Sequence, residues 1–279
     1  MQLFVPKTEG GANMPTDFTL IYPHAPVSAF FPDWIEQNRT SKLALEWQSA
    51  LVSFFVIKEF NSQEAFLIGS GFLMLCDGKM TVIATASHVI TEMRKYASSF
   101  ISVDGVKFLF EKLEIFFNDK QDYALIPLTK KMATSIPNSI VFSSKTNGNE
   151  IKTSSFVIIG YPARHNKLHK QRPEKGLHYY NLTFHNFFYE TKTEDVFFYF
   201  VPEGKNKNIT FENISTKTSV PSLSGMSGGA IAQIIIDLTS RQPLLRAVGI
   251  FKEHRPKRGN YLVGATFVDF ADEVNALVE

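Results

Sequence analysis

The chain has 279 residues, of which 44% are hydrophobic, so it can bury a sizeable core in one large domain or two small ones. Its formal net charge of +2 is close to neutral, which argues against a surface for nucleic acid. The first residues hold no apolar signal core, and no apolar run reaches the roughly 18 residues of a membrane span, so we expect neither a leader nor a membrane contact.

The N-terminal segment, residues 1–48, matches no pattern that predicts a domain, and we expect it to be an extension. Within it, the stretch 32–48 opens on Pro-Asp and is rich in helix formers, which predicts a partly helical segment. Its apolar residues are unevenly spaced, so no single buried face is predicted for this helix.

From residue 51 onward, apolar runs of strand length alternate with turn signals, a pattern that predicts an all-β fold. The pairs Asp77-Gly78 and Asp104-Gly105 are typical of tight hairpins, and the segment 147–149 marks a join between two series of strands. The lone cysteine, Cys76, permits no internal disulfide, which is typical of a reducing compartment, and we expect a cytoplasmic protein. The first series is 51–57, 66–76, 81–84, 100–103, 107–110, 113–117 and 124–128, and the second is 155–159, 179–184, 196–201, 209–213, 230–238, 244–251 and 261–267.

Helical signals are confined to the two ends of the chain. Asp269 is placed to cap a final helix in which Phe270, Val274 and Leu277 share one face. The basic stretches 164–175 and 252–258 follow strands and contain Pro, so they are predicted to be solvated loops.

The segment Ser224–Ala230 places Ser227 between glycines, directly before an apolar strand. Glycines on both sides let a hydroxyl project while nearby N–H groups turn toward one point, which suits a nucleophile of acyl transfer. A plain Gly-Ser turn between two strands is the alternative that this segment alone leaves open.

A serine hydroxyl needs a base and an orienting acid before it attacks, and His88 and Asp122 each lie beside an apolar strand. The segments Thr85–His88, Asp122–Leu125 and Gly225–Gly229 resemble the Thr-Ala-Ala-His, Asp-Ile-Ala-Leu and Gly-Asp-Ser-Gly-Gly motifs of trypsin-like serine proteases. Their order along the chain excludes an α/β-hydrolase, in which the acid and the histidine follow the serine.

The resemblance extends from about residue 50 to the C-terminus, and it includes Gly69–Phe72 and Gly160–Pro162. It implies two six-stranded antiparallel barrels, residues 49–146 and 147–279, the second carrying the C-terminal helix. It also implies a serine endopeptidase that works through an acyl-enzyme and needs no metal or cofactor. In this enzyme Ser227 would be the nucleophile, His88 the base and Asp122 the acid that orients it. The backbone N–H groups of Gly225 and Ser227 would form the oxyanion hole.

A polypeptide substrate is expected to add as a strand beside Ile250, Phe251 and Lys252. Pro221 stands where the trypsin branch carries the acid that selects basic side chains, so a small or apolar side chain is the expected preference. His254 either lines the pocket or is an exposed loop histidine.

Two departures from the family concern control of the site. Met226 replaces the Asp before the nucleophile, and no Ile-Val-Gly-Gly start is present, so the usual activating ion pair cannot form. The site is therefore either preformed or controlled by the N-terminal segment or a regulatory partner protein, as in bacterial stress-response, quality-control or phage-defence proteases. Two other functions stay open: a catalytically silent protease fold that binds peptides, and an esterase with the same acyl chemistry.

Overall fold

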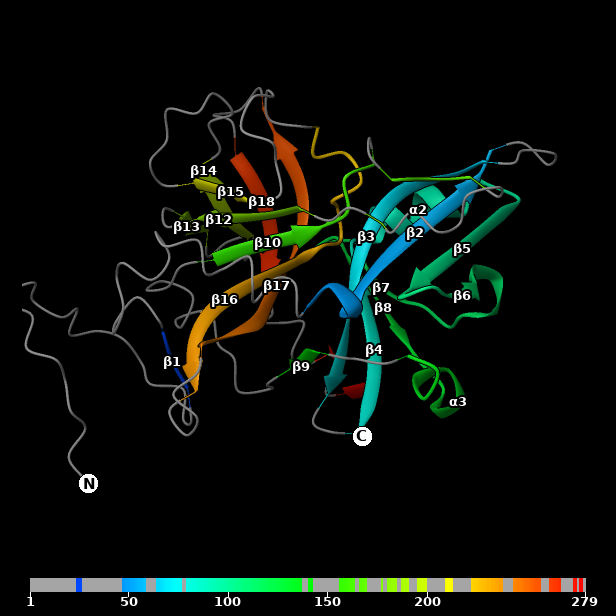
Figure 1. The fold of residues 1–279 in the computed structure, drawn as a ribbon, viewed down its shortest axis with the longest axis horizontal. Coiled ribbons are helices and arrows are strands. Elements are labelled where there is room, and N and C mark those ends of the chain that lie inside the picture. The colour runs from blue at the N-terminus through cyan, green and yellow to red at the C-terminus, as the bar shows by residue number, and fades with distance from the viewer. Residues whose placement is uncertain are drawn as a thin grey trace, which may run out of the picture.

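The computed structural model describes residues 24–26, 47–58, 64–76, 79–136, 140–142, 156–163, 166–169, 177, 180–184, 187–190, 195–199, 209–212, 222–237, 243–256, 261–266, 273–274 and 276–277. Within them the protein is mostly β, as predicted, and its strands form two sheets that lie side by side (Figure 1). The predicted N-terminal helix falls largely outside these residues. The short helical segments are η3 (Gln48–Ala50), α2 (Ser87–Met93), η4 (Phe110–Lys112) and α3 (Lys130–Ala133). The described residues near the chain end, 273–274 and 276–277, are also helical and fall within the predicted final helix, whose start at Asp269 lies outside the described residues.

The first sheet is built from the N-terminal series of strands. Its order is β6 (Val106–Leu109), β5 (Ser98–Val103), β2 (Leu51–Ile57), β3 (Glu64–Cys76), β4 (Met80–Thr85), β8 (Tyr123–Pro127) and β7 (Phe116–Asn118). These neighbours pair antiparallel. The predicted Asp104-Gly105 hairpin joins β5 to β6, and both of its residues have positive φ.

The second sheet is built from the C-terminal series. Its order is β13 (Phe187–Glu190), β14 (Asp195–Tyr199), β18 (Tyr261–Thr266), β17 (Pro243–Arg255), β16 (Ala230–Asp237), β10 (Phe156–Gly160), β12 (Tyr180–Phe184) and β15 (Ile209–Glu212). Strand β1 (His24–Pro26) pairs antiparallel with the far end of β16, so part of the N-terminal extension joins this sheet.

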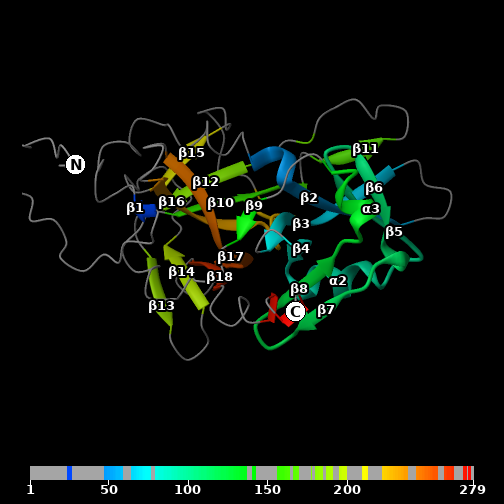
Figure 2. The ribbon, with the colours of Figure 1, turned by 90° about the horizontal axis from the view of Figure 1, so that it is seen from below.

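Two short strands tie the sheets together. Strand β9 (Ile140–Phe142) runs parallel to the end of β3 and lies between the two sheets, whereas β11 (Lys167–His169) pairs with the start of β3 (Figure 2). The prediction of a solvated loop over 164–175 is therefore wrong at β11, because the chain crosses there to the first sheet before it returns as β12. The chain end also returns to the first sheet, where Asn118 Nδ2 donates to Glu273 Oε1 at 3.0 Å.

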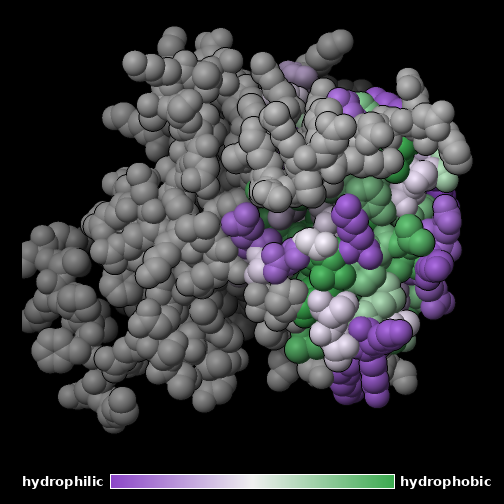
Figure 3. All heavy atoms as spheres, turned by 45° about the vertical axis from the view of Figure 1, so that its right-hand side comes forward, coloured by the Kyte–Doolittle hydropathy of each residue, from purple (hydrophilic) through white to green (hydrophobic). Residues whose placement is uncertain are grey.

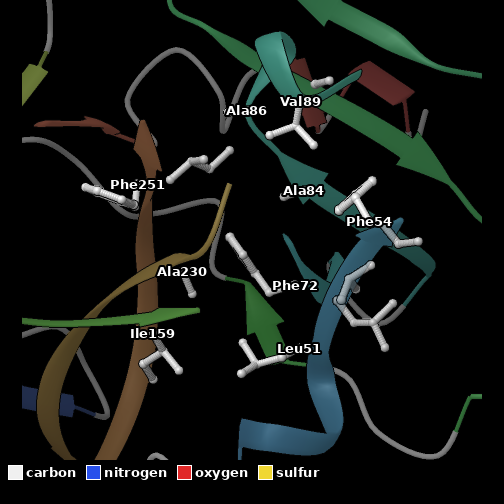
Figure 4. Packing of buried hydrophobic residues seen from close by; sticks show 14 of the residues in the cluster. Leu51, Phe54, Phe72, Ala84, Ala86, Val89, Ile159, Ala230 and Phe251 are labelled. Carbon is white, nitrogen blue, oxygen red and sulfur yellow. The ribbon is translucent and has the colours of Figure 1, made fainter. Parts of the chain in front are cut away.

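One apolar core serves both sheets. It contains fully buried phenylalanines of the first sheet, such as Phe54 and Phe72, and of the second, such as Phe156 and Phe251. In Figure 4 the ring of Phe72 points into the region where side chains of the two sheets meet. Burial of such aromatic side chains contributes about 1.5–3 kcal/mol each, so the core holds the sheets at a fixed distance.

The surface over the first sheet carries hydrophobic side chains framed by hydrophilic ones (Figure 3). Among the described residues, the exposed large apolar side chains are Leu109 and Phe116. Leu109 lies on β6 and Phe116 on β7, the two strands that end the order of this sheet. Exposure of large apolar groups is thus concentrated at the sheet's edges.

Candidate active site

His88 lies in the first turn of α2, which begins immediately after β4. We expected this histidine at the end of a strand, with helices only at the two ends of the chain. That prediction is wrong, because the extended Ala86 is followed at once by the seven residues of α2. Val89 and Ile90 of the helix are buried, whereas the His88 side chain is 48% exposed. A solvent-accessible imidazole therefore sits on a support that the core holds rigid.

Asp122 lies in the turn between β7 and β8 and directs its carboxylate at His88. Strand β8 pairs with β4, with Ala124 opposite Thr85, and this register brings the turn beside the start of α2. The φ of Asp122 is +58°, a left-handed conformation that Asp and Asn adopt more readily than most residues. The backbone is thus strained at the position where the side chain must point at the imidazole.

Four contacts hold the Asp122 carboxylate. His88 Nδ1 lies 2.8 Å from Oδ2 and 3.0 Å from Oδ1. Oδ1 also accepts from the backbone N–H of His88 at 3.0 Å and from Ser87 Oγ at 3.1 Å. Because an ionised carboxylate only accepts, the His88 proton sits on Nδ1, and Nε2 of the neutral ring is left as an acceptor.

The environment of Asp122 favours its charged form. Burial alone would raise the pKa of its carboxyl, but the hydrogen bond and the charge of His88, with further hydrogen bonds from the His88 backbone and Ser87, bring that pKa below its usual value. The carboxylate is thus held ionised beside the imidazole, where it fixes the tautomer and stabilises a positive charge on the ring.

Ser227 lies in a turn, residues 224–229, in which some backbone N–H groups donate to protein carbonyls and others do not. Met226 N–H donates to Leu223 O at 3.0 Å, Gly228 N–H to Phe251 O at 2.7 Å and Gly229 N–H to Met226 O at 2.9 Å. Within the part of the chain that the structure describes, the N–H groups of Gly225 and Ser227 have no such partner. Two donors of this turn are therefore available to a ligand.

Close packing brings this turn beside the strand end that leads to His88. Gly228 has a φ of +87°, and a Cβ atom there would collide with Ser70 O and Thr85 Oγ1 and lie 3.0 Å from Ala86 N. Only glycine fits this position. Among the described residues, no hydrogen bond joins the Ser227 hydroxyl to the His88 imidazole, so the structure brings His88 and Asp122 together directly and Ser227 only into their neighbourhood.

The expected substrate strand, β17, is fixed to the same turn. Phe251 accepts from Gly228 N–H and donates to Gly229 O at 2.8 Å, while pairing of β17 with β16 ends at Ile250. Beyond Phe251, β17 pairs with β18 through Glu253, His254 and Arg255. His254 is half-buried. Pro221 lies outside the described residues.

The side chain of Lys252 is engaged within the second sheet. Its Nζ lies 2.8 Å from Asp195 Oδ1, and both side chains are 9% exposed. Any contact of Lys252 with a substrate would therefore involve its main chain. The prediction of a solvated loop over 252–258 is wrong for residues 252–255, because they belong to β17 and Lys252 is buried in this ion pair.

Among the described residues, no three His, Cys, Asp or Glu side chains converge as metal ligands do. None of the helices in this part of the chain has the length and apolar character of a membrane span.

No protein-family model and no curated protein matches the chain. Its structure is similar to the active form of the Rv3671c protease from M. tuberculosis, with 13% identity, a TM-score of 0.48 and coverage of 85% of this chain and 84% of that one. A serine endoprotease from Yersinia pestis shows 14% identity, a TM-score of 0.49 and coverage of 85% and 66%. The thermostable serine protease AL20 from an extremophilic microorganism shows 13% identity, a TM-score of 0.48, and coverage of 84% of this chain and 98% of that one. Likeness at this level carries no argument about chemistry, which has to come from the site itself.

Proposed function

We propose that the chain is a serine endopeptidase with Ser227 as nucleophile, His88 as base and Asp122 as orienting acid. The observation that carries this proposal is the exposed His88 imidazole, whose Nδ1 lies 2.8 Å from Oδ2 of the partly buried Asp122 carboxylate. The turn with two available N–H donors lies beside it and supplies the place for a developing negative oxygen. The motif order in the sequence points to the same assignment.

In the proposed reaction, Ser227 Oγ attacks the carbonyl carbon of a peptide bond while its proton passes to His88 Nε2. The carbonyl oxygen becomes negative and accepts hydrogen bonds from Gly225 N–H and Ser227 N–H. When the tetrahedral intermediate collapses, the amine leaves with the proton from His88 and an acyl-enzyme ester remains. Water then repeats the sequence, giving its proton to His88, and the collapse returns a proton to Ser227.

The substrate is proposed to be a polypeptide that adds as a strand along β17, where pairing with β16 has ended. The proposed architecture is a double barrel, with His88 and Asp122 on the first sheet and Ser227 on the second. Because the buried Met226 replaces an acid, control by a partner protein, in bacterial defence or quality control, is part of the proposal.

One observation favours the silent alternative, a protease fold that only binds peptides: the missing hydrogen bond between Ser227 and His88. Catalytic hydrogen bonds are often long before substrate binds and tighten only in the complex. The absence of this hydrogen bond is therefore compatible with the proposed enzyme. Reactivity of the hydroxyl decides between the two functions.

The test is labelling with a fluorophosphonate probe, which phosphonylates activated serines. We expect the wild-type protein to label, and Ser227→Ala and His88→Ala to fall below detection. Ser135→Ala, which removes an exposed hydroxyl from a distant helix end, is the matched control and should label as wild type does. A wild-type protein that labels no better than Ser227→Ala would exclude the enzyme. Labelling without cleavage of a peptide library would instead favour an esterase or a specialised peptidase that needs a partner protein.

A further inference from the structure

The hydroxyl of Ser70, on β3, is fully buried at the junction of the two sheets. It accepts from Tyr161 N–H at 2.8 Å and lies 2.7 Å from Gly225 O and 3.4 Å from Tyr161 O. A hydroxyl has one proton to donate, and the shorter contact takes it, so Ser70 donates to Gly225 O. The backbone N–H of Ser70 donates to Ser227 O at 2.7 Å. One residue thus holds two carbonyls of the 224–229 turn.

The four consecutive carbonyls from Ser224 to Ser227 all have protein donors. Ala163 N–H holds Ser224 O at 2.7 Å, Gly229 N–H holds Met226 O, and Ser70 holds the other two. In a trans peptide the C=O and the following N–H point in opposite directions. The Ser224 and Met226 carbonyls therefore set the direction of the Gly225 and Ser227 N–H groups, which are the two without a protein partner among the described residues. The carbonyls that Ser70 holds belong to the peptides on either side of the Met226–Ser227 peptide, so Ser70 fixes from both sides the peptide that carries the Ser227 N–H.

The residue before Ser227 is Met226, which is fully buried and uncharged, so no ion pair at this position holds the turn. We propose that Ser70 is a positioning residue that keeps the turn preformed, with the Ser227 N–H, on the peptide between the two that Ser70 holds, directed for oxyanion binding. This inference rests on the proposed function for its catalytic consequence and on the hydrogen bonds for the shape of the turn. The shape of the turn then depends on hydrogen bonds within the fold and not on a new N-terminus.

Ser70→Ala removes the hydroxyl and leaves two buried groups, Gly225 O and Tyr161 N–H, without it. Rotation of the Gly225–Met226 peptide is the route by which Gly225 O regains a partner, and that rotation turns the adjoining Met226–Ser227 peptide and misdirects the Ser227 N–H. Ser53→Ala is the matched control, because Ser53 is also fully buried, pairs with Ser70 across β2 and β3, and donates to Ser102 O on β5 at 3.1 Å rather than to the turn. A merely structural role predicts that both variants behave alike.

Two readouts on the full chain test the inference: the rate of fluorophosphonate labelling, and the amide resonances of protein labelled with ¹⁵N-glycine. We expect Ser70→Ala to label about 10- to 100-fold more slowly than wild type, somewhat less than deletion of an oxyanion donor, and Ser53→Ala to label within about twofold. We expect the Gly225 and Gly228 resonances to shift or broaden in Ser70→Ala alone. Gly105, whose Cβ direction is open space, is the internal reference.

Equal labelling of Ser70→Ala and wild type with an unchanged Gly225 resonance would overturn the inference and leave the proposed function intact. Equal slowing in both serine variants would overturn it too, since that is the signature of general destabilisation. A wild-type protein that does not label would remove the proposed function, and the glycine resonances alone would then decide whether Ser70 shapes the turn.

Discussion

The tight packing of Gly228 can be measured by adding one methyl group. A Cβ atom at Gly228 collides with Ser70 O and Thr85 Oγ1, whereas a Cβ atom at Gly105 has nothing within 4 Å. The two glycines have nearly the same φ, +87° and +82°, so replacement by Ala adds a similar backbone strain of about 1–2 kcal/mol at both. Any further loss in Gly228→Ala comes from packing.

Overpacking of a tight site adds about 1–3 kcal/mol, so we expect Gly105→Ala to lose about 1–2 kcal/mol and Gly228→Ala about 2–5 kcal/mol of unfolding free energy. Urea unfolding followed by circular dichroism measures both, with Gly105→Ala as the strain control. Equal losses would refute the close contact of the turn with β3 and β4. A slower fluorophosphonate reaction in Gly228→Ala alone would link that contact to the site.

Two further predictions concern charged groups. Lys252→Met should lose about 3–5 kcal/mol of unfolding free energy, because Asp195 is left buried without its cation. The double variant with Asp195→Leu should regain most of that stability. An unchanged urea midpoint in the single variant would contradict the buried pair. The lowered pKa of Asp122 stabilises the fold above the unfolded-state pKa of about 3.9, and this contribution is lost as pH falls through the lower folded-state value. Urea unfolding from about pH 6 to about pH 2 should therefore show a smaller acid loss in Asp122→Asn, which also tolerates the positive φ, and an identical loss would contradict the shift.

The sequence predicted most strands because apolar runs and turn signals are local features. The run 51–57 coincides with β2, and the Asp104-Gly105 pair forms the hairpin expected of it. Strands β9 and β11 were missed because they are three residues long and exist only through pairing with β3. Helix α2 was missed because Thr85–His88 was interpreted as the end of a strand.

The candidate site divides in the same way. Side chains that carry chemistry, His88, Asp122 and Ser227, have sequence motifs. Their supports do not: the hydroxyl of Ser70 and the N–H of Ala163 act through hydrogen bonds between segments far apart in the chain. A pattern within a few residues cannot reveal which distant carbonyl a buried hydroxyl meets.

The anchors of the 224–229 turn also set when the site can form. They come from β3, from the crossover after β10 and from β17, which is among the last strands to be synthesised. A growing chain therefore carries His88 and Asp122 long before it can hold Ser227 in a reactive turn. On the proposed function, the turn that holds the nucleophile is complete only after β17 has been synthesised and paired with it.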